Sequence, residues 1–95
     1  MNLQQFEASL ADTSPPSGLS EPLTSLWLEA NGRWEEAHEL VRHELGAYAW
    51  VHAYLHRVEG VLWNADYWYR QAERKRPSCS VKEEWRSIAQ ALLGQ

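Results

Sequence analysis

Apolar residues recur every three or four positions along almost the whole chain, which is the spacing of one face of an α-helix. No segment alternates apolar and polar residues for long enough to predict a β-strand. The pattern predicts five or six short helices, in segments at about residues 3–10, 22–30, 33–45, 47–59, 61–75 and 80–93. We therefore expect an all-α fold.

Local signals set the predicted helix ends. The segment TSPPSG (Thr13–Gly18) ends the first helix, because two prolines in sequence cannot continue it. Pro22 suits the first turn of the second helix, and Pro77 follows the fifth. Ser80 and Glu83 have the spacing of a capping box, in which each side chain bonds the other residue's amide at the start of a helix. The last predicted helix therefore begins after Ser80.

Very short connections join the central helices. Gly32, Gly46 and Gly60 separate consecutive helical segments, so the segments must fold back on one another as antiparallel hairpins. We expect one domain over residues 1–95. It divides into an N-terminal helix with a proline-rich linker (1–18), two helical hairpins (19–77) and a C-terminal capping helix (80–93).

An internal repeat accompanies the hairpins. The segments ANGRWEEAHELV and VEGVLWNADYWY superpose with glycine on glycine and alanine on alanine, and the second copy continues to an alanine and a proline. The positions that match are Gly32 with Gly60, Ala37 with Ala65, and Val41 with Tyr69, followed by Ala72 and Pro77. This ladder resembles the tetratricopeptide repeat, although the chain's spacing is shorter than the usual spacing of about 34 residues. The resemblance implies a compact, tetratricopeptide-like bundle of helical hairpins.

A narrower resemblance covers Gly32 to Ala72. Three segments, W-x-x-A-H, H-A-Y-L-H-R-x-E-G and N-A-x-Y-W-Y, are similar to those of a group of small bacterial proteins without an assigned activity. The resemblance implies a bacterial source, a fold and a region in which to look for a site. It implies no chemistry.

Composition and charge narrow the classes of function. Hydrophobic residues make up 44% of the chain and charged residues 23%, as in ordinary globular domains. The net charge of −4 argues against binding to nucleic acid or to an anionic membrane surface. Cys79 is the only cysteine, so no internal disulfide can form, and no secretory signal or membrane-spanning run precedes the helices. We expect a cytoplasmic protein.

A histidine cluster is the main candidate site. His52, His56 and Glu59 fall within one stripe about 60° wide on the predicted 47–59 helix. His38 lies in the apolar stripe of the preceding helix, and a hairpin at Gly46 brings it level with His52. Three imidazoles and a carboxylate in one pocket form a suitable ligand set for zinc or another divalent transition metal.

Three interpretations of this cluster stay open. The histidines can be packing residues that hydrogen-bond to their neighbours and hold the hairpin together. They can line a pocket for a small molecule or a peptide, or they can bind a metal ion, with an enzymatic role as one version of these site hypotheses. Packing is the most economical of the three, and no cofactor is required unless the metal interpretation holds.

A second group of candidates lies in NADYWYR. Asn64, Tyr67 and Arg70 share one helix face and, with Trp63, form a polar, aromatic-lined wall that could hold a ligand. The same spacing lets Asp66 pair with Arg70 across one turn. Packing of these aromatic side chains is the simpler interpretation.

Six tryptophans and four tyrosines exceed what a 95-residue core obviously requires. Surplus tryptophan, tyrosine and arginine are typical of protein interfaces. The leading functional hypothesis is therefore a protein-interaction or ligand-binding module that associates with itself or with a protein partner. An enzymatic activity is the less favoured alternative.

Four cations lie at the C-terminal end of the predicted 61–75 helix and directly after it. They are Arg70, Arg74, Lys75 and Arg76. Cations at a helix C-terminus complement the helix dipole, and this explanation is preferred to a phosphate-binding site.

Overall fold

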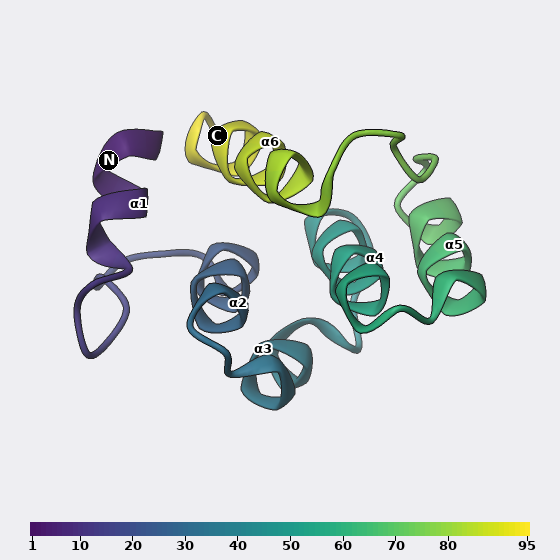
Figure 1. The fold of residues 1–95 in the computed structure, drawn as a ribbon, viewed down its shortest axis with the longest axis horizontal. Coiled ribbons are helices and arrows are strands. Elements are labelled where there is room, and N and C mark those ends of the chain that lie inside the picture. Colours follow the sequence, from purple (N-terminus) through teal and green to yellow (C-terminus); the bar gives the residue numbers. More distant parts are fainter.

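The computed structural model describes residues 1–95 and contains six α-helices and no β-strand (Figure 1). The helices are α1 (Leu3–Ser9), α2 (Glu21–Ala30), α3 (Trp34–Val41), α4 (Ala47–Glu59), α5 (Leu62–Gln71) and α6 (Val81–Leu93). The all-α fold predicted from the hydrophobic spacing is confirmed. No helix combines the length and hydropathy that crossing a membrane requires.

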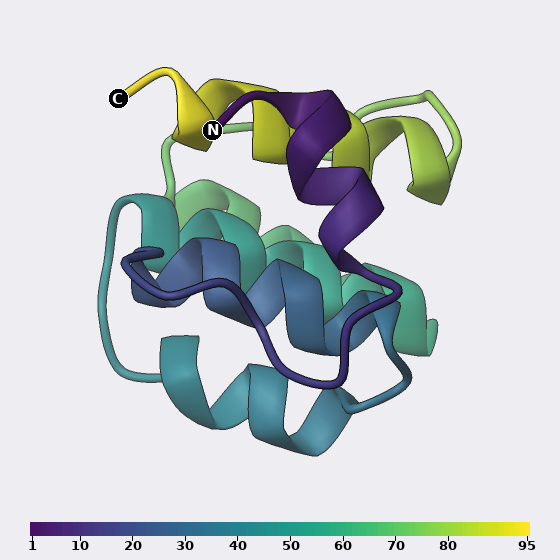
Figure 2. The ribbon, with the colours of Figure 1, turned by 90° about the vertical axis from the view of Figure 1, so that its left-hand side faces the viewer.

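Helix α4 is the centre of the arrangement. Its backbone lies close to those of α2, α3, α5 and α6, whereas the backbone of α5 lies close to that of α4 alone. Figures 1 and 2 show α1 and α6 on one side of the α2 and α4 layer, with α3 on the opposite side. The chain thus forms a small bundle in which α3 and α5 are both neighbours of α4.

Two tight hairpins, α2–α3 and α4–α5, carry the internal repeat. Gly32 and Gly60 follow the first helix of each hairpin with φ of +75° and +88°, a left-handed conformation that glycine adopts without strain. Ala37 and Ala65, at matching positions, are both fully buried. Small side chains at these points let the paired helices approach closely, and Ser25 uses that proximity to donate a 2.8 Å hydrogen bond to the Ala37 carbonyl.

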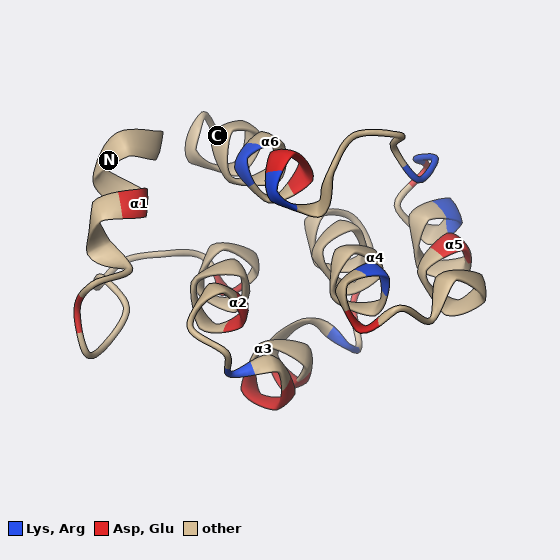
Figure 3. Cartoon of the chain, viewed as in Figure 1, with Lys and Arg blue, Asp and Glu red and all other residues tan.

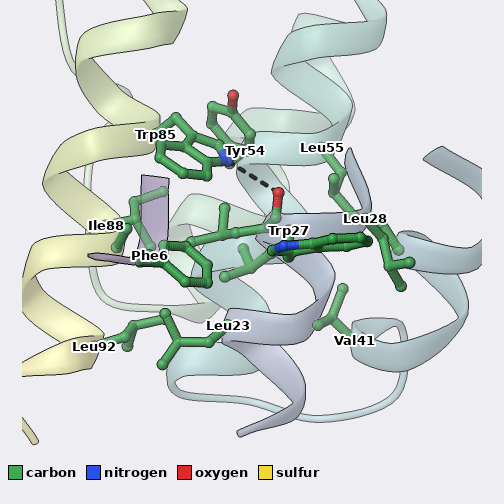
Figure 4. Close-up of a cluster of buried hydrophobic side chains, with 14 residues drawn as sticks. Phe6, Leu23, Trp27, Leu28, Val41, Tyr54, Leu55, Trp85, Ile88 and Leu92 are labelled. Atoms are coloured by element: carbon green, nitrogen blue, oxygen red, sulfur yellow. Dashed lines mark hydrogen bonds between the residues drawn. The ribbon is translucent and has the colours of Figure 1, made fainter. Parts of the chain in front are cut away.

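The main core lies between α1, α2, α3, α4 and α6 (Figure 4). Phe6 stacks on Trp85 with ring centroids 5.5 Å apart. Each buried indole N–H is satisfied by a backbone carbonyl, since Trp85 donates to Leu26 at 3.0 Å and Trp27 donates to Ser9 at 3.3 Å. Tryptophan thereby fills volume in a small domain without leaving its N–H unpaired.

Two predicted helix ends are wrong. The third helix ends at Val41 instead of Leu45, and Leu45, which a longer helix would place on the same face as Val41, is 63% exposed. Residues 42–46 are all exposed, so no tertiary contact supports a longer helix there. The fifth helix ends at Gln71 instead of Lys75, and Glu73 then adopts a left-handed φ of +59°.

Two apolar residues are exposed although helical spacing aligns them with the buried positions of α4 and α5. Val58 and Leu62, on either side of the α4–α5 turn, are exposed. The contact between α4 and α5 is made instead by Ala53, Ala65 and Tyr69, which form a small second core. The buried face of the hairpin is therefore rotated away from the positions that hydropathy alone favours.

A buried ion pair joins three helices. Arg57 of α4 donates to Glu84 of α6 at 2.8 Å, and the Tyr69 hydroxyl of α5 donates to both oxygens of the same carboxylate at 2.7 and 2.6 Å. Arg57 also donates to the Cys79 carbonyl. The two charged side chains are only 13% and 4% exposed. Burial, reinforced by the neighbouring carboxylate, raises the pKa of Tyr69, so its hydroxyl keeps the proton that it donates.

Replacing the cation of this pair is expected to destabilise the fold. Arg57→Met removes the charge and keeps much of the side-chain volume, which leaves the Glu84 carboxylate buried without its cation. We expect the free energy of unfolding in urea to fall by about 3 kcal/mol. Arg86→Met is the matched control, because Arg86 pairs with Glu7 at 3.2 Å where both side chains are largely solvated, and it should cost less than about 1 kcal/mol. Equal losses in the two variants would contradict the assigned role of Arg57.

Candidate histidine site

Three histidine side chains converge between α3 and α4. His38 lies on α3, and His52 and His56 lie one turn apart on α4. The Nε2 atoms of His38 and His52 are 3.0 Å apart. One ring nitrogen from each of the three histidines lies within 4.8 Å of the other two. The structure thus brings together the three imidazoles that the sequence placed on facing helices.

Glu59 lies at the edge of the histidine cluster and contacts the imidazole of His56. Its Oε1 atom is 2.7 Å from Nδ1 of His56, and its side chain is about one-third exposed. Because Nδ1 of His56 is engaged in this way, Nε2 is the ring nitrogen left for another partner. A carboxylate in this position fixes the tautomer and orientation of an imidazole, as it does for histidines that bind metal ions.

Two tryptophan rings enclose the imidazoles. Trp34 of α3 stacks on His38 with centroids 4.9 Å apart, and Trp68 of α5 stacks on His52 at 4.0 Å. The Trp34 indole also donates a 2.9 Å hydrogen bond to the Leu55 carbonyl of α4. The two indole rings therefore fix the orientation of the His38 and His52 imidazoles and restrict the access of water to them. Sequence reasoning assigned no site role to either tryptophan, although Trp34 lies one turn before His38, which places the two on the same helix face.

Burial keeps two of the imidazoles neutral. His52 is 3% exposed, and this desolvation, together with repulsion from His56 and His38, lowers its pKa to about 3. Burial also lowers the pKa of His38, and the charge of His56 acts in the same direction. Neutral imidazole has a free lone pair, which is the form that binds a metal ion.

One buried nitrogen of the cluster is left without a partner. Nδ1 of His52 is inaccessible and makes no hydrogen bond, whichever tautomer the ring adopts. If Nε2 of His52 donates to His38, Nδ1 is an unused acceptor. If Nε2 accepts, Nδ1 carries an unused proton. An unpaired buried polar group of this kind costs about 1 to 3 kcal/mol.

The charges around the cluster favour a cation. Glu35 and Glu39 on α3 act on His38 in the direction that stabilises positive charge, and Arg42 acts against them. Glu59 adds a third carboxylate at the other end of the cluster. The cluster thus has three carboxylates and one guanidinium around it.

The second predicted group does not join the histidines. Trp63 is 75% exposed and Tyr67 is also exposed, so neither lines a site with the cluster. The predicted pairing of Asp66 with Arg70 is wrong, because Asp66 instead bonds Arg76 at 2.9 Å. The loop after α5 turns back far enough to bring Arg76 to this carboxylate.

Asn64 and Arg70 complete that second group. Asn64 is half-buried, Arg70 is exposed, and neither side chain bonds to a histidine. Of the eight predicted binding residues, only His38, His52, His56 and Glu59 form one connected group.

Comparison of the chain with protein families, curated proteins and solved structures gave no match. The functional assignment therefore rests on the chemistry of the site.

The lowered pKa of His52 predicts how stability depends on pH in the metal-free protein. Between about pH 6.5, the ordinary value, and pH 3, the unfolded chain binds a proton at His52 that the folded chain excludes. Above pH 6.5 neither state binds this proton, and the free energy of unfolding is at its full value. As the pH falls below 6.5, the free energy of unfolding decreases, with a slope of at most about 1.4 kcal/mol per pH unit. Urea unfolding from pH 7.5 to 4, with a chelator present, measures it.

Two variants isolate the effect of His52 from that of other acid-sensitive groups. His52→Gln should flatten the slope between pH 6.5 and 4. His43→Gln should change the slope much less, because His43 is exposed in the loop after α3, lies outside the cluster and is the weakest of the groups that lower the pKa of His52. An unchanged slope in His52→Gln would show that His52 is not the group excluded from protonation.

Proposed function

We propose that this protein binds a divalent transition-metal ion, such as zinc, through the imidazoles of His38, His52 and His56. The observation that carries the proposal is the convergence of their ring nitrogens within 4.8 Å from two different helices. Neutral imidazole is a preferred ligand of zinc and related ions. The neutral state of two of these rings and the acidic surroundings support the same assignment.

One pair of imidazoles already has nearly the spacing that a tetrahedral ion needs, whereas separations in the cluster that extend up to 4.8 Å must shorten when the ion binds. Two nitrogens bound to one zinc at tetrahedral angles lie about 3.3 Å apart, given zinc–nitrogen distances of about 2.0 to 2.1 Å. The His38–His52 contact of 3.0 Å is close to this value. An ion at Nε2 of His52 replaces the contact with His38, and an ion at Nδ1 supplies the partner that this atom lacks. In either case Glu59 orients His56.

Three protein ligands leave a fourth position on the ion. Zinc sites with three protein ligands and a bound water are typical of catalysis, whereas structural sites have four protein ligands. His38 is only half-buried, so the fourth position is expected on its side of the cluster. Metal binding is the proposed function. If the protein is also an enzyme, the reaction that we propose is hydrolysis by a water bound at the fourth position of the ion.

Metal titration tests the proposal. Protein freed of metal by chelation should bind one equivalent of zinc, and cobalt(II) should give the visible absorption of a tetrahedral nitrogen-liganded site. His38→Ala, His52→Ala and His56→Ala should each abolish binding of that equivalent. Glu59→Gln should weaken it about 10- to 100-fold, because Glu59 acts through His56.

The fourth histidine provides the control. His43→Ala should retain both the stoichiometry and the affinity, since His43 lies outside the cluster. Circular dichroism of every variant separates the loss of a ligand from the loss of the fold. The proposal fails if the folded wild-type protein binds no ion, or if His43→Ala weakens binding as much as the cluster variants do.

Self-association through α5 is a second candidate function, and the exposure of its aromatic residues favours it. Leu62, Trp63 and Tyr67 are exposed on a helix whose backbone lies close to that of α4 alone. We propose that a second copy of the chain covers this face. In a two-fold antiparallel pairing of α5 helices, Trp63 of each copy lies opposite Tyr67 of the other, and Arg70 lies opposite the acidic Glu59.

Sedimentation at increasing protein concentration tests this pairing. The wild-type chain should form dimers, and Trp63→Ser combined with Tyr67→Ser should raise the dimer dissociation constant at least about tenfold. Leu45→Ser is the control, because Leu45 is an equally exposed apolar residue outside α5. A wild-type protein that stays monomeric at millimolar concentration would rule out the second candidate.

A further inference from the structure

A group of basic residues lies at the C-terminal end of α5, away from the α4–α5 turn. Figure 3 shows Lys and Arg positions, in blue, at the end of this helix and in the loop that follows. A hollow of about 570 Å³ opens there, and we call it the basic hollow. Its lining residues are Asp66, Tyr69, Arg70, Arg74, Lys75, Arg76, Pro77 and Ser78.

The backbone after α5 shapes this hollow. The helix ends at Gln71, and Glu73 then adopts a φ of +59°, which turns the chain back over the helix end. The Arg74 amide donates to the Tyr69 carbonyl at 2.8 Å, and the Arg76 side chain reaches Asp66 at 2.9 Å. Arg74, Lys75 and Arg76 therefore lie beyond the helix. The helix dipole accounts for Arg70 alone, so it does not explain why four cations are placed around one hollow.

The basic hollow carries a local excess of positive charge. Four cations and one carboxylate line it, in a chain whose net charge is −4. Arg76 is neutralised by Asp66, and the Arg74 guanidinium lies 3.4 Å from the Trp50 ring centroid, a contact that leaves its charge intact. Arg70 and Lys75 make no ion pair at all. Three positive charges thus have no carboxylate partner.

The walls of the hollow are firmly held. Tyr69 is buried and bonds the Glu84 carboxylate of α6, and Arg57 bonds the Cys79 carbonyl just after the basic segment. Arg76 is held by Asp66 on the side of α5. The loop is therefore tied to α4 and α5, which reduces the ordering cost when a ligand binds between its cations.

We propose that the basic hollow binds a diphosphate group, either as the free anion or as part of a larger molecule. Arginine presents paired N–H donors that match phosphate oxygens, and lysine adds a point charge. A diphosphate carries enough negative charge to use Arg70, Arg74 and Lys75 together. The volume exceeds that of the anion itself, which leaves room for an attached organic group beside Tyr69 and Pro77.

Calorimetric titration at low salt tests the site with two probes, inorganic pyrophosphate and adenosine diphosphate. We expect saturable binding of one equivalent that weakens steeply as salt is added. Similar affinities for the probes indicate recognition of the diphosphate alone, and tighter adenosine diphosphate binding indicates that the attached group contributes. Both results support the proposal. A chelator in the buffer makes the result independent of the histidine site.

Charge-removing variants locate the binding. Arg70→Gln combined with Lys75→Gln should weaken pyrophosphate binding at least about tenfold, because neither side chain has another ionic partner to lose. Arg42→Gln combined with Lys82→Gln is the control, since it removes the same charge at exposed positions outside the hollow. The proposal is overturned if neither probe binds saturably, or if the two double variants weaken binding equally.

Discussion

The burial of α4 on every side is the constraint on which the rest of the structure depends. Six consecutive residues, Val51–His56, are buried, and six residues span more than a full turn of an α-helix. Helices α2, α3, α5 and α6 together cover this central element. Three of the six buried residues, His52, Tyr54 and His56, are polar. Every helix that covers α4 must therefore either satisfy one of these side chains or pack against the apolar ones between them.

The surrounding helices meet this requirement in different ways. Tyr54 donates to Glu29 of α2, where burial raises the pKa of the carboxyl. His56 bonds Glu59 on its own helix, and His52 bonds His38 of α3. Arg57, at the edge of the buried run, is neutralised by α6. Of these groups only His52 keeps an unsatisfied atom, so the one defect in the polar packing of α4 coincides with the place where three imidazoles meet.

The parts of this arrangement that could be predicted from sequence are those with local causes. The turn at Gly60 follows from one residue's conformational freedom, and the inward position of His38 follows from helical spacing. The end of α3 before Leu45 could not be predicted, because it depends on the absence of supporting contacts. The Arg57–Glu84 pair joins residues 27 positions apart, and only the packing of α6 against α4 brings them together. To predict the histidine cluster from sequence, one tertiary contact had to be known, that of α3 with α4. The short connection at Gly46 predicts this contact, because it folds the two helices back on each other.

A purely structural role leaves the composition of the cluster unexplained. An apolar side chain at position 52 would fill the space between α3, α4 and Trp68 without the cost of desolvating an imidazole or of leaving Nδ1 unpaired. Buried polar groups add less to stability than well-packed apolar residues of similar volume, even when they are paired. Three imidazoles in contact, two of them kept neutral by burial and with acidic residues around them, are thus a costly way to hold a hairpin together and a suitable way to hold a cation. This difference in cost is the physical reason for assigning the cluster a ligand.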